Sequence, residues 1–228
     1  MNFLIILNLI LFEPITVHGE PILFNNLEDR IQIDLPEGGE ILGPGFSINA
    51  NYLFSEYFLD KSFSMEGSKG IVFEGDSMKV NGYELLFKND LVSISESVNG
   101  YFQDFKFESN LMILDIQKNQ FSLSGNEEKT LIFNNFFSIS ANFVQFNMND
   151  QFLSAKKNVY FNFDKNSMNF HGTALSLEYK SDLGLLNFHD VFLSDDKGYD
   201  VKAEYLELNE SKKELNLSGD FEIRLKDD

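Results

Sequence analysis

The alternation of apolar and polar residues constrains the fold of this chain more than any other feature. From Ile48 onward, apolar side chains recur at every second position, as in Val159–Phe163 and Phe221–Leu225. Side chains of a β-strand point alternately to its two faces, so a period of two predicts strands. No segment of helical length shows an amphipathic stripe, and the sequence therefore predicts an almost all-β protein.

Clusters of turn-forming residues separate the predicted strands. Asn, Asp, Gly and Ser adopt the backbone conformations that tight turns need, and Asn-Gly is a strong hairpin signal. We also expect His189–Asp190 to form a turn before the strand that follows it. The other predicted turns are Asn81–Gly82, Lys88–Asp90, Asn99–Gly100, Asn147–Asp150, Asp164–Ser167, Ser181–Asp182 and Asp195–Gly198.

A repeated motif organises these hairpins. Leu206 and Leu208, followed by the run Leu215–Gly219, match Met112 and Leu114, followed by the run Phe121–Gly125, at a constant offset of 94 residues. Looser copies begin at Ala141 and Ala174. One hairpin cannot bury its own apolar face, so we expect antiparallel hairpin repeats to stack on each other. The Ser-Gly that ends the unit would let the chain bend sharply.

The chain divides into three predicted regions. Residues 1–19 contain the short apolar run Phe3–Phe12 and end in small residues, which is typical of a secretory signal peptide cleaved after Gly19. A retained segment that anchors the chain in the inner membrane is the alternative. Residues 20–47, rich in proline and glycine, are predicted to form an N-terminal edge strand, Arg30–Leu35, and a loop. Residues 48–228 would form the β-hairpin repeat domain.

Composition narrows the classes of partner. The chain has 36 acidic and 18 basic residues, a net charge of −18, which repels nucleic acid and anionic membrane surfaces. It has no cysteine, so disulfides contribute nothing to its stability. Its 25 Phe and 8 Tyr provide enough apolar surface for a folded core.

The sequence offers no clear catalytic or metal-binding motif. His171 and His189 lack the neighbouring ligands of a zinc site, and no nucleophile-elbow motif supports a serine hydrolase. Asp195–Asp200 has acidic residues at the density of a calcium loop but lacks its register, which favours a solvated hairpin turn. Gly43–Gly45 is not followed by the residues of a phosphate loop. We therefore predict no catalytic residue, no metal and no cofactor.

The aromatic and aliphatic interior is the remaining candidate for function. It is either a filled core or a partly open groove that accepts acyl chains, and composition favours neither.

The repeat at Ala203–Leu225, and more weakly at Ala50–Phe73, Ala141–Phe163 and Ala174–Leu193, resembles the OstA-like repeat. Members of that family are periplasmic components of lipopolysaccharide transport. The resemblance implies a single extended, twisted and open β-jelly roll. It also implies a non-enzymatic carrier or bridge that shields lipid acyl chains during export to the outer membrane.

The same resemblance implies partners and a binding surface. The partners would be a lipopolysaccharide-like lipid and either like-fold transport proteins or further copies of this chain, paired through edge strands. The groove would be lined by the apolar positions of the clearest repeats. These are Met112, Leu114, Phe121, Leu123, Val159, Phe161, Phe163, Leu206, Leu208, Leu215, Leu217, Phe221 and Ile223. The alternative hypothesis is a secreted structural or adhesion β-solenoid that binds a protein partner.

Overall fold

The computed structural model describes residues 5–7, 15–43, 45–60, 62–75, 77–125, 129–165 and 168–225. All regular elements in these ranges are β-strands, which confirms the predicted all-β fold of antiparallel hairpins. The described ranges include no helix with the length and apolar character needed to span a bilayer. The chain forms two compact units, and each is described by itself. Unit 1 comprises residues 1–104 and 111–117, and unit 2 comprises residues 105–110 and 118–228.

Unit 1 is built from two layers of antiparallel strands. In one layer β2, β5 and β6 pair in that order, and in the other β3, β4 and β7 do so. β8 belongs to both layers, since its first half pairs with β7 and its second half with β6. The strands are β1 (Ile5–Leu7), β2 (Ile15–Gly19), β3 (Leu23–Asn26), β4 (Arg30–Leu35), β5 (Gly39–Gly43), β6 (Phe46–Ala50), β7 (Tyr52–Phe58), β8 (Phe63–Gly75), β9 (Met78–Lys88), β10 (Leu91–Phe102) and the last part of β11 (Phe105–Asp115).

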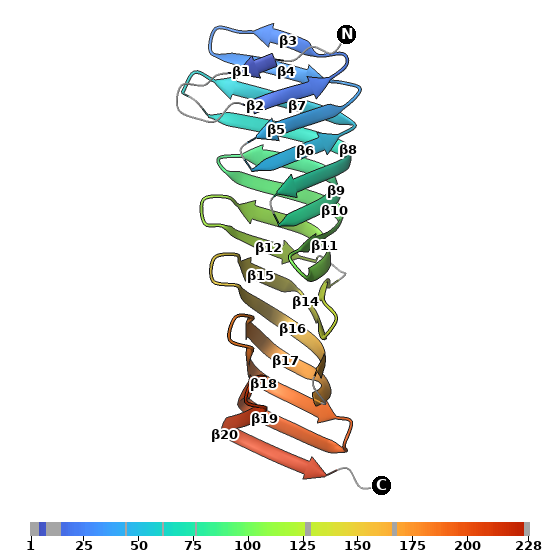
Figure 1. Ribbon diagram of the computed structural model, residues 1–228, viewed down its shortest axis with the longest axis vertical. Coiled ribbons are helices and arrows are strands. Elements are labelled where there is room, and N and C mark those ends of the chain that lie inside the picture. Colours follow the sequence, from blue (N-terminus) through green and yellow to red (C-terminus); the bar gives the residue numbers. More distant parts are fainter. Residues whose placement is uncertain are drawn as a thin grey trace. The chain divides into compact units, whose positions relative to one another are not determined.

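Unit 2 repeats this plan. In one layer β13, β14 and the second half of β16 pair in that order, and in the other β12, β15 and the first half of β16 do so. From β16 onward each strand crosses both layers and pairs with the next along its length (Figure 1). The strands after the first part of β11 are β12 (Gln120–Ser124), β13 (Thr130–Phe133), β14 (Phe137–Ala141), β15 (Phe143–Asn147), β16 (Phe152–Lys165), β17 (Met168–Lys180), β18 (Leu185–Asp195), β19 (Tyr199–Asn209) and β20 (Glu214–Leu225).

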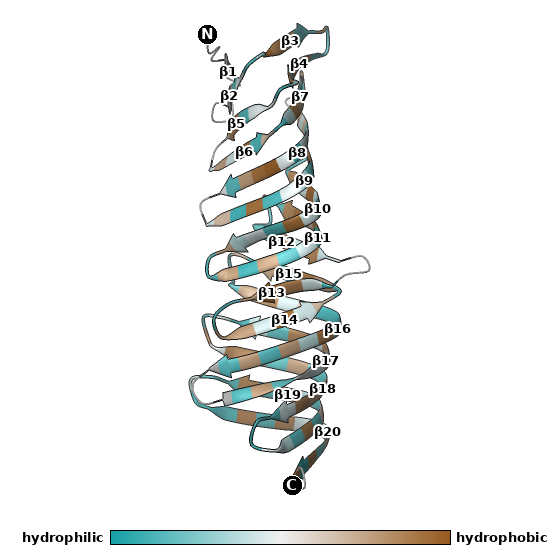
Figure 2. Ribbon diagram, turned by 90° about the vertical axis from the view of Figure 1, so that its right-hand side faces the viewer, coloured by the Kyte–Doolittle hydropathy of each residue, from teal (hydrophilic) through white to brown (hydrophobic). Residues whose placement is uncertain are grey.

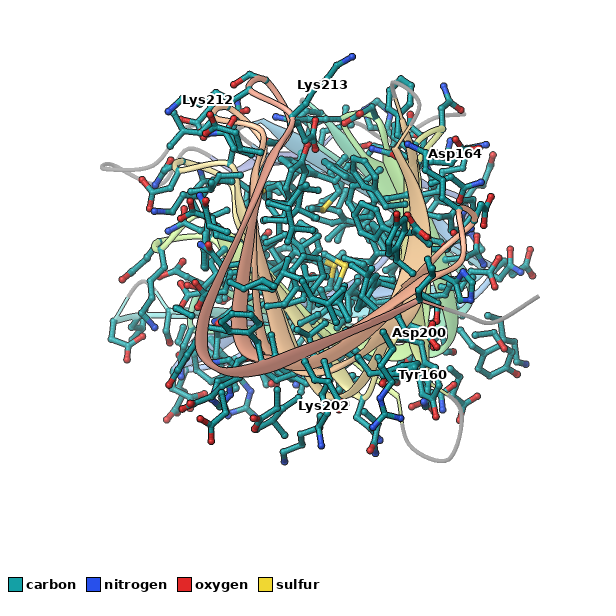
Figure 3. All side chains as sticks on the ribbon, turned by 90° about the horizontal axis from the view of Figure 1, so that it is seen from below. Tyr160, Asp164, Asp200, Lys202, Lys212 and Lys213 are labelled. Carbon is teal, nitrogen blue, oxygen red and sulfur yellow. The ribbon has the colours of Figure 1, made fainter. Side chains whose placement is uncertain are left out.

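Bends within the long strands make this two-layered plan possible. In β16, Lys157 and Asn158 have φ angles of 65° and 55°, and the register with β17 shifts at this point. In β20 the bend falls at Gly219, with φ of 75°. An irregularity of this kind bends a strand sharply, so that a single strand serves both layers. Figure 3 shows the bent course of β20, with the side chains of Lys202 and Lys213 pointing away from the interior.

The alternating pattern places apolar side chains between the two layers of each unit. Figure 2 shows this alternation along β16–β19, and the inward residues are almost wholly buried. The alanines that begin the sequence repeats lie beside the bends, where the layers converge and leave least room for a side chain. These alanines, Ala50, Ala141, Ala174 and Ala203, are 0–7% exposed.

Three of the predicted turns are wrong, because their residues lie within strands and not between them. Asn81–Gly82 lies inside β9, Asn99–Gly100 inside β10, and His189–Asp190 inside β18. All three lie at or near the point where a strand passes between layers, where the same residue types are favoured as in turns. Hairpin turns do follow Lys88, Asn147, Lys180 and Asp195, as predicted. In the turn predicted at Asp164–Ser167, residues 166 and 167 lie outside the described residues.

The N-terminal region contains more strands than predicted. Arg30–Leu35 forms the predicted strand, β4, but the segment predicted as loop also contributes β3 and β5. Of the predicted signal peptide, residues 1–4 and 8–14 lie outside the described residues. Residues 15–19 form β2, which pairs with β5 and buries Val17 completely.

Candidate functional site

Two continuous apolar rows line the interior of unit 2. Strand pairing carries each row from one strand to the next, because residues that are opposite each other in register share a face. The first row consists of Phe121, Phe146, Leu153, Tyr179, Leu186, Leu208 and Leu215. The second row consists of Leu123, Val144, Ala155, Leu177, Phe188, Leu206 and Leu217.

The structure divides the predicted groove residues between the two units. Met112 and Leu114 belong to the part of β11 in unit 1, where they are 1% and 6% exposed. The remaining predicted residues belong to unit 2. Those on β12, β16 and β19 are buried there, namely Phe121, Leu123, Val159, Phe161, Phe163, Leu206 and Leu208.

The last strand of unit 2 leaves the same interior face uncovered. Phe221 and Ile223 are 58% and 55% exposed, although their register partners on β19, Ala203 and Val201, are 3% and 7% exposed. Leu215 is likewise 41% exposed. These side chains are accessible because β20 pairs with β19 along one edge, while Figure 1 shows no described strand along its other edge.

Aromatic rings fill the space between the layers of unit 2. Phe161 of one layer packs on Phe188 of the other, with ring centroids 4.6 Å apart. Phe137 meets Tyr179 edge-on at 5.2 Å, close to the free edges of the two layers. Both of these last side chains are at least nine-tenths buried. The interior of unit 2 is therefore closed along its length by side chains and uncovered at β20.

The interior of unit 1 combines aromatic rings with two hydroxyl groups. Phe46 of one layer packs on Phe87 of the other at 6.1 Å, and Tyr57 packs on Phe63 at 4.6 Å. Tyr57 is 5% exposed, and burial raises the pKa of its hydroxyl well above the ordinary value. Ser55, two residues earlier on β7, is 1% exposed. Among the residues that the structure describes, neither hydroxyl has a hydrogen-bond partner.

Sequence reasoning missed these two hydroxyls. Ser55 and Tyr57 alternate with Phe54 and Glu56 along β7. Their side chains therefore point to the same apolar face as that of Leu53. The signal in the sequence is a serine at a position where the alternating pattern would place an inward-facing apolar residue. Neither Ser55 nor Tyr57 belongs to the aliphatic and phenylalanine residues that define the apolar pattern of the repeat.

The histidines and the acidic turn take part in local contacts on the outer side of unit 2. The ring of His189 packs on Tyr205 at 4.8 Å, and its Nδ1 lies 3.7 Å from an Asp190 carboxylate oxygen. His171 lies on β17 opposite Asn162 and Ser194. In the hairpin after β18, Asp195 Oδ1 accepts hydrogen bonds from the backbone amides of Lys197 and Tyr199. The described residues contain no cluster of three or more potential metal ligands.

No family model matches the chain, and no curated protein sequence matches it. Among solved structures, it is similar to LptH, described as the LptA-homologous periplasmic component of the conserved lipopolysaccharide transport device from Pseudomonas aeruginosa. The TM-score is 0.47 at 10% sequence identity, and the match covers 54% of this chain and 95% of that one. The fold described above accordingly rests on the strand pairing of this chain.

Proposed function

We propose that this protein is a non-enzymatic periplasmic carrier that shields the acyl chains of lipopolysaccharide, or a similar lipid, on the way to the outer membrane. The observation that carries the proposal is the course of the apolar rows in unit 2. They run unbroken through successive strands to β20, where Leu215 of the first row is exposed. Phe221 and Ile223, farther along the same strand, are exposed as well. The resemblance of the repeats to OstA-like repeats supports the same function.

The physical basis of the proposal is the burial of hydrocarbon. Each methylene group that moves from water into an apolar environment contributes about 0.8 kcal/mol. An amphiphile with several acyl chains therefore crosses an aqueous compartment at low cost only if a protein covers those chains. Every side chain in the apolar rows of unit 2 is aliphatic or aromatic, and only Tyr179 carries a polar atom. The lipid head group would remain in water.

Partners would bind at β20. An edge strand presents unpaired backbone amides and carbonyls, and it can add a strand from another chain. A like-fold transport protein, or a second copy of this chain, would extend the sheet and cover Phe221 and Ile223 at the same time. The apolar rows would then continue from one subunit to the next.

Lipid analysis after purification from the periplasm tests the proposal. We expect native mass spectrometry and organic extraction to detect a multi-acyl lipid on the wild-type protein. Leu215→Asp and Phe221→Asp place a carboxylate on the exposed interior face and should reduce lipid recovery. Asn216→Asp is the matched control, since it introduces the same charge on the outward side of β20, where Asn216 pairs with Glu207.

The alternative is a structural or adhesion protein that uses β20 to bind a protein partner. The dense packing of Phe121 on Phe146, with ring centroids 5.5 Å apart, favours it, because a filled interior has no room for lipid until side chains move. A folded protein that carries no lipid and takes up none from added vesicles would exclude the carrier function and support this alternative.

A further inference from the structure

Strand β2 lies within the segment that the sequence predicts to be removed with a signal peptide. Cleavage after Gly19 would take away the whole of this strand, Ile15–Gly19. In the structure, residues 16–19 of β2 pair with β5 in a regular antiparallel register (Figure 1). β2 is thus a strand of one layer of unit 1, and the predicted cleavage would remove part of the fold.

Val17 begins an inward-facing apolar row of unit 1. It lies opposite Ile41 of β5. Strand pairing continues the row through Ile48, Phe73 and Val80. All five side chains are 0–3% exposed. Without β2, β5 would become the edge strand and Ile41 would lose its apolar neighbour, which is unfavourable because buried apolar surface would return to water.

Gly39 on β5 is fitted to the presence of β2. A Cβ atom at this position would lie 2.3 Å from the backbone carbonyl oxygen of His18 and 2.8 Å from Cδ1 of Leu35. The φ angle of Gly39 lies outside the left-handed region, so its backbone conformation is open to other residues. The close approach of β2, and not the backbone conformation, therefore requires glycine at position 39.

Gly19 has a reason of its own to lack a side chain. A Cβ atom at this position would lie 2.9 Å from Cδ2 of Leu35. Leu35 belongs to β4 in the other layer and is 1% exposed, so it packs over Gly19 across the interior of unit 1. A small residue at this position is typical of a signal-peptidase site, but the packing of Leu35 accounts for it within the folded protein.

We propose that residues 15–19 belong to the mature protein and that the chain is not cleaved after Gly19. The mature N-terminus then lies at or before Ile15. Cleavage upstream of Ile15 and retention of the whole N-terminal segment both agree with this inference. The inference is independent of the proposed carrier function, because it concerns only which residues make up the folded protein.

The N-terminus of the mature protein tests the inference directly. The full chain is expressed, the protein is purified from the periplasm or the membrane fraction, and its first residue is identified by N-terminal sequencing and intact mass. We expect a chain that begins at or before Ile15. A chain that begins at Glu20, or at any other residue after Ile15, would overturn the inference and leave the carrier function standing.

Gly39→Ala provides a second measurement, since it lies outside the predicted signal peptide and leaves the cleavage sequence unchanged. With β2 in place the added methyl group meets the carbonyl oxygen of His18, so we expect the melting temperature to fall by about 5 °C or more. Gly75→Ala is the matched control, because the nearest atom to a Cβ at that position is 3.6 Å away. Equal melting temperatures of the two variants would mean that β2 is missing from the mature fold.

Discussion

The side-chain amide of Asn158 donates a hydrogen bond to Oδ1 of Asn142 at 3.0 Å, across the bend that takes β16 from one layer of unit 2 to the other. Asn158 itself has a φ of 55°, in the left-handed region. Asparagine tolerates this conformation better than most residues, and its amide can also bond to a neighbouring strand. The bend thus depends on both the backbone and the side chain of one residue.

Two substitutions measure how much the backbone conformation of Asn158 contributes to the free energy of unfolding. Asn158→Val and Asn158→Gly both remove the hydrogen bond to Asn142, but only valine opposes a positive φ. We expect Asn158→Val to lower the free energy of unfolding by about 1–2 kcal/mol more than Asn158→Gly, measured by urea denaturation. Equal destabilisation by the two substitutions would show that the left-handed conformation costs nothing at this position.

Gly172 is expected to be irreplaceable because of a close backbone approach. A Cβ atom at this position would lie 2.0 Å from the carbonyl oxygen of Phe192 and 2.9 Å from the ring of Phe161. Gly172→Ala should therefore destabilise the protein by more than about 3 kcal/mol or prevent folding. At Gly75 the nearest atom would be 3.6 Å away, so Gly75→Ala serves as the control. Similar melting temperatures for the two variants would contradict the prediction.

Leu208 and Leu215 provide a direct measure of how open the end of unit 2 is. They lie opposite each other in register on the same interior face, yet Leu208 is 2% exposed and Leu215 is 41% exposed. Truncation of a buried leucine costs about 2–5 kcal/mol, so we expect Leu208→Ala to reduce the free energy of unfolding within this range. Leu215→Ala should cost less than about 1 kcal/mol. A comparable loss for both would mean that β20 is covered in solution, for example by a second copy.

Tyr57 should make the protein sensitive to alkaline pH. Burial raises the pKa of its hydroxyl above the ordinary value of 10.0, which applies to an unfolded chain. Above that pH the unfolded state loses a proton that the folded state keeps, so the stability present at lower pH falls as pH rises. The loss is about 1.4 kcal/mol for each pH unit between the two pKa values.

The variant Tyr57→Phe isolates this effect from the titration of the other tyrosines. We expect urea denaturation at pH 8 and pH 11 to show a smaller loss of stability for Tyr57→Phe than for the wild type. An identical loss in both proteins would mean that the Tyr57 hydroxyl titrates with an ordinary pKa and is accessible to water.

The positions of turns illustrate where sequence reasoning succeeded and where it did not. Lys88–Asp90 is a true hairpin turn, whereas Asn99–Gly100 continues a strand. Both contain residues that adopt left-handed or irregular backbone conformations. Local sequence shows that the chain changes direction there, but whether it reverses or passes to the other layer depends on which strand lies alongside. That is a long-range property, and Asn81 bonded to Asn99 at 3.0 Å on the neighbouring strand is an example of it.

The period of two alone determined that the chain is all-β and which side chains face inward, because side-chain direction in a strand follows directly from position parity. The Ser-Gly that ends the repeat also predicted a sharp bend, and Gly219 has the positive φ of such a bend, 75°. Only the tertiary structure decided that Leu208 is buried while Leu215 is accessible, and that the buried hydroxyls of Ser55 and Tyr57 have no hydrogen-bond partner among the described residues. Exposure and hydrogen bonding depend on what lies across the interior and along the last edge, and strands distant in the sequence supply those neighbours.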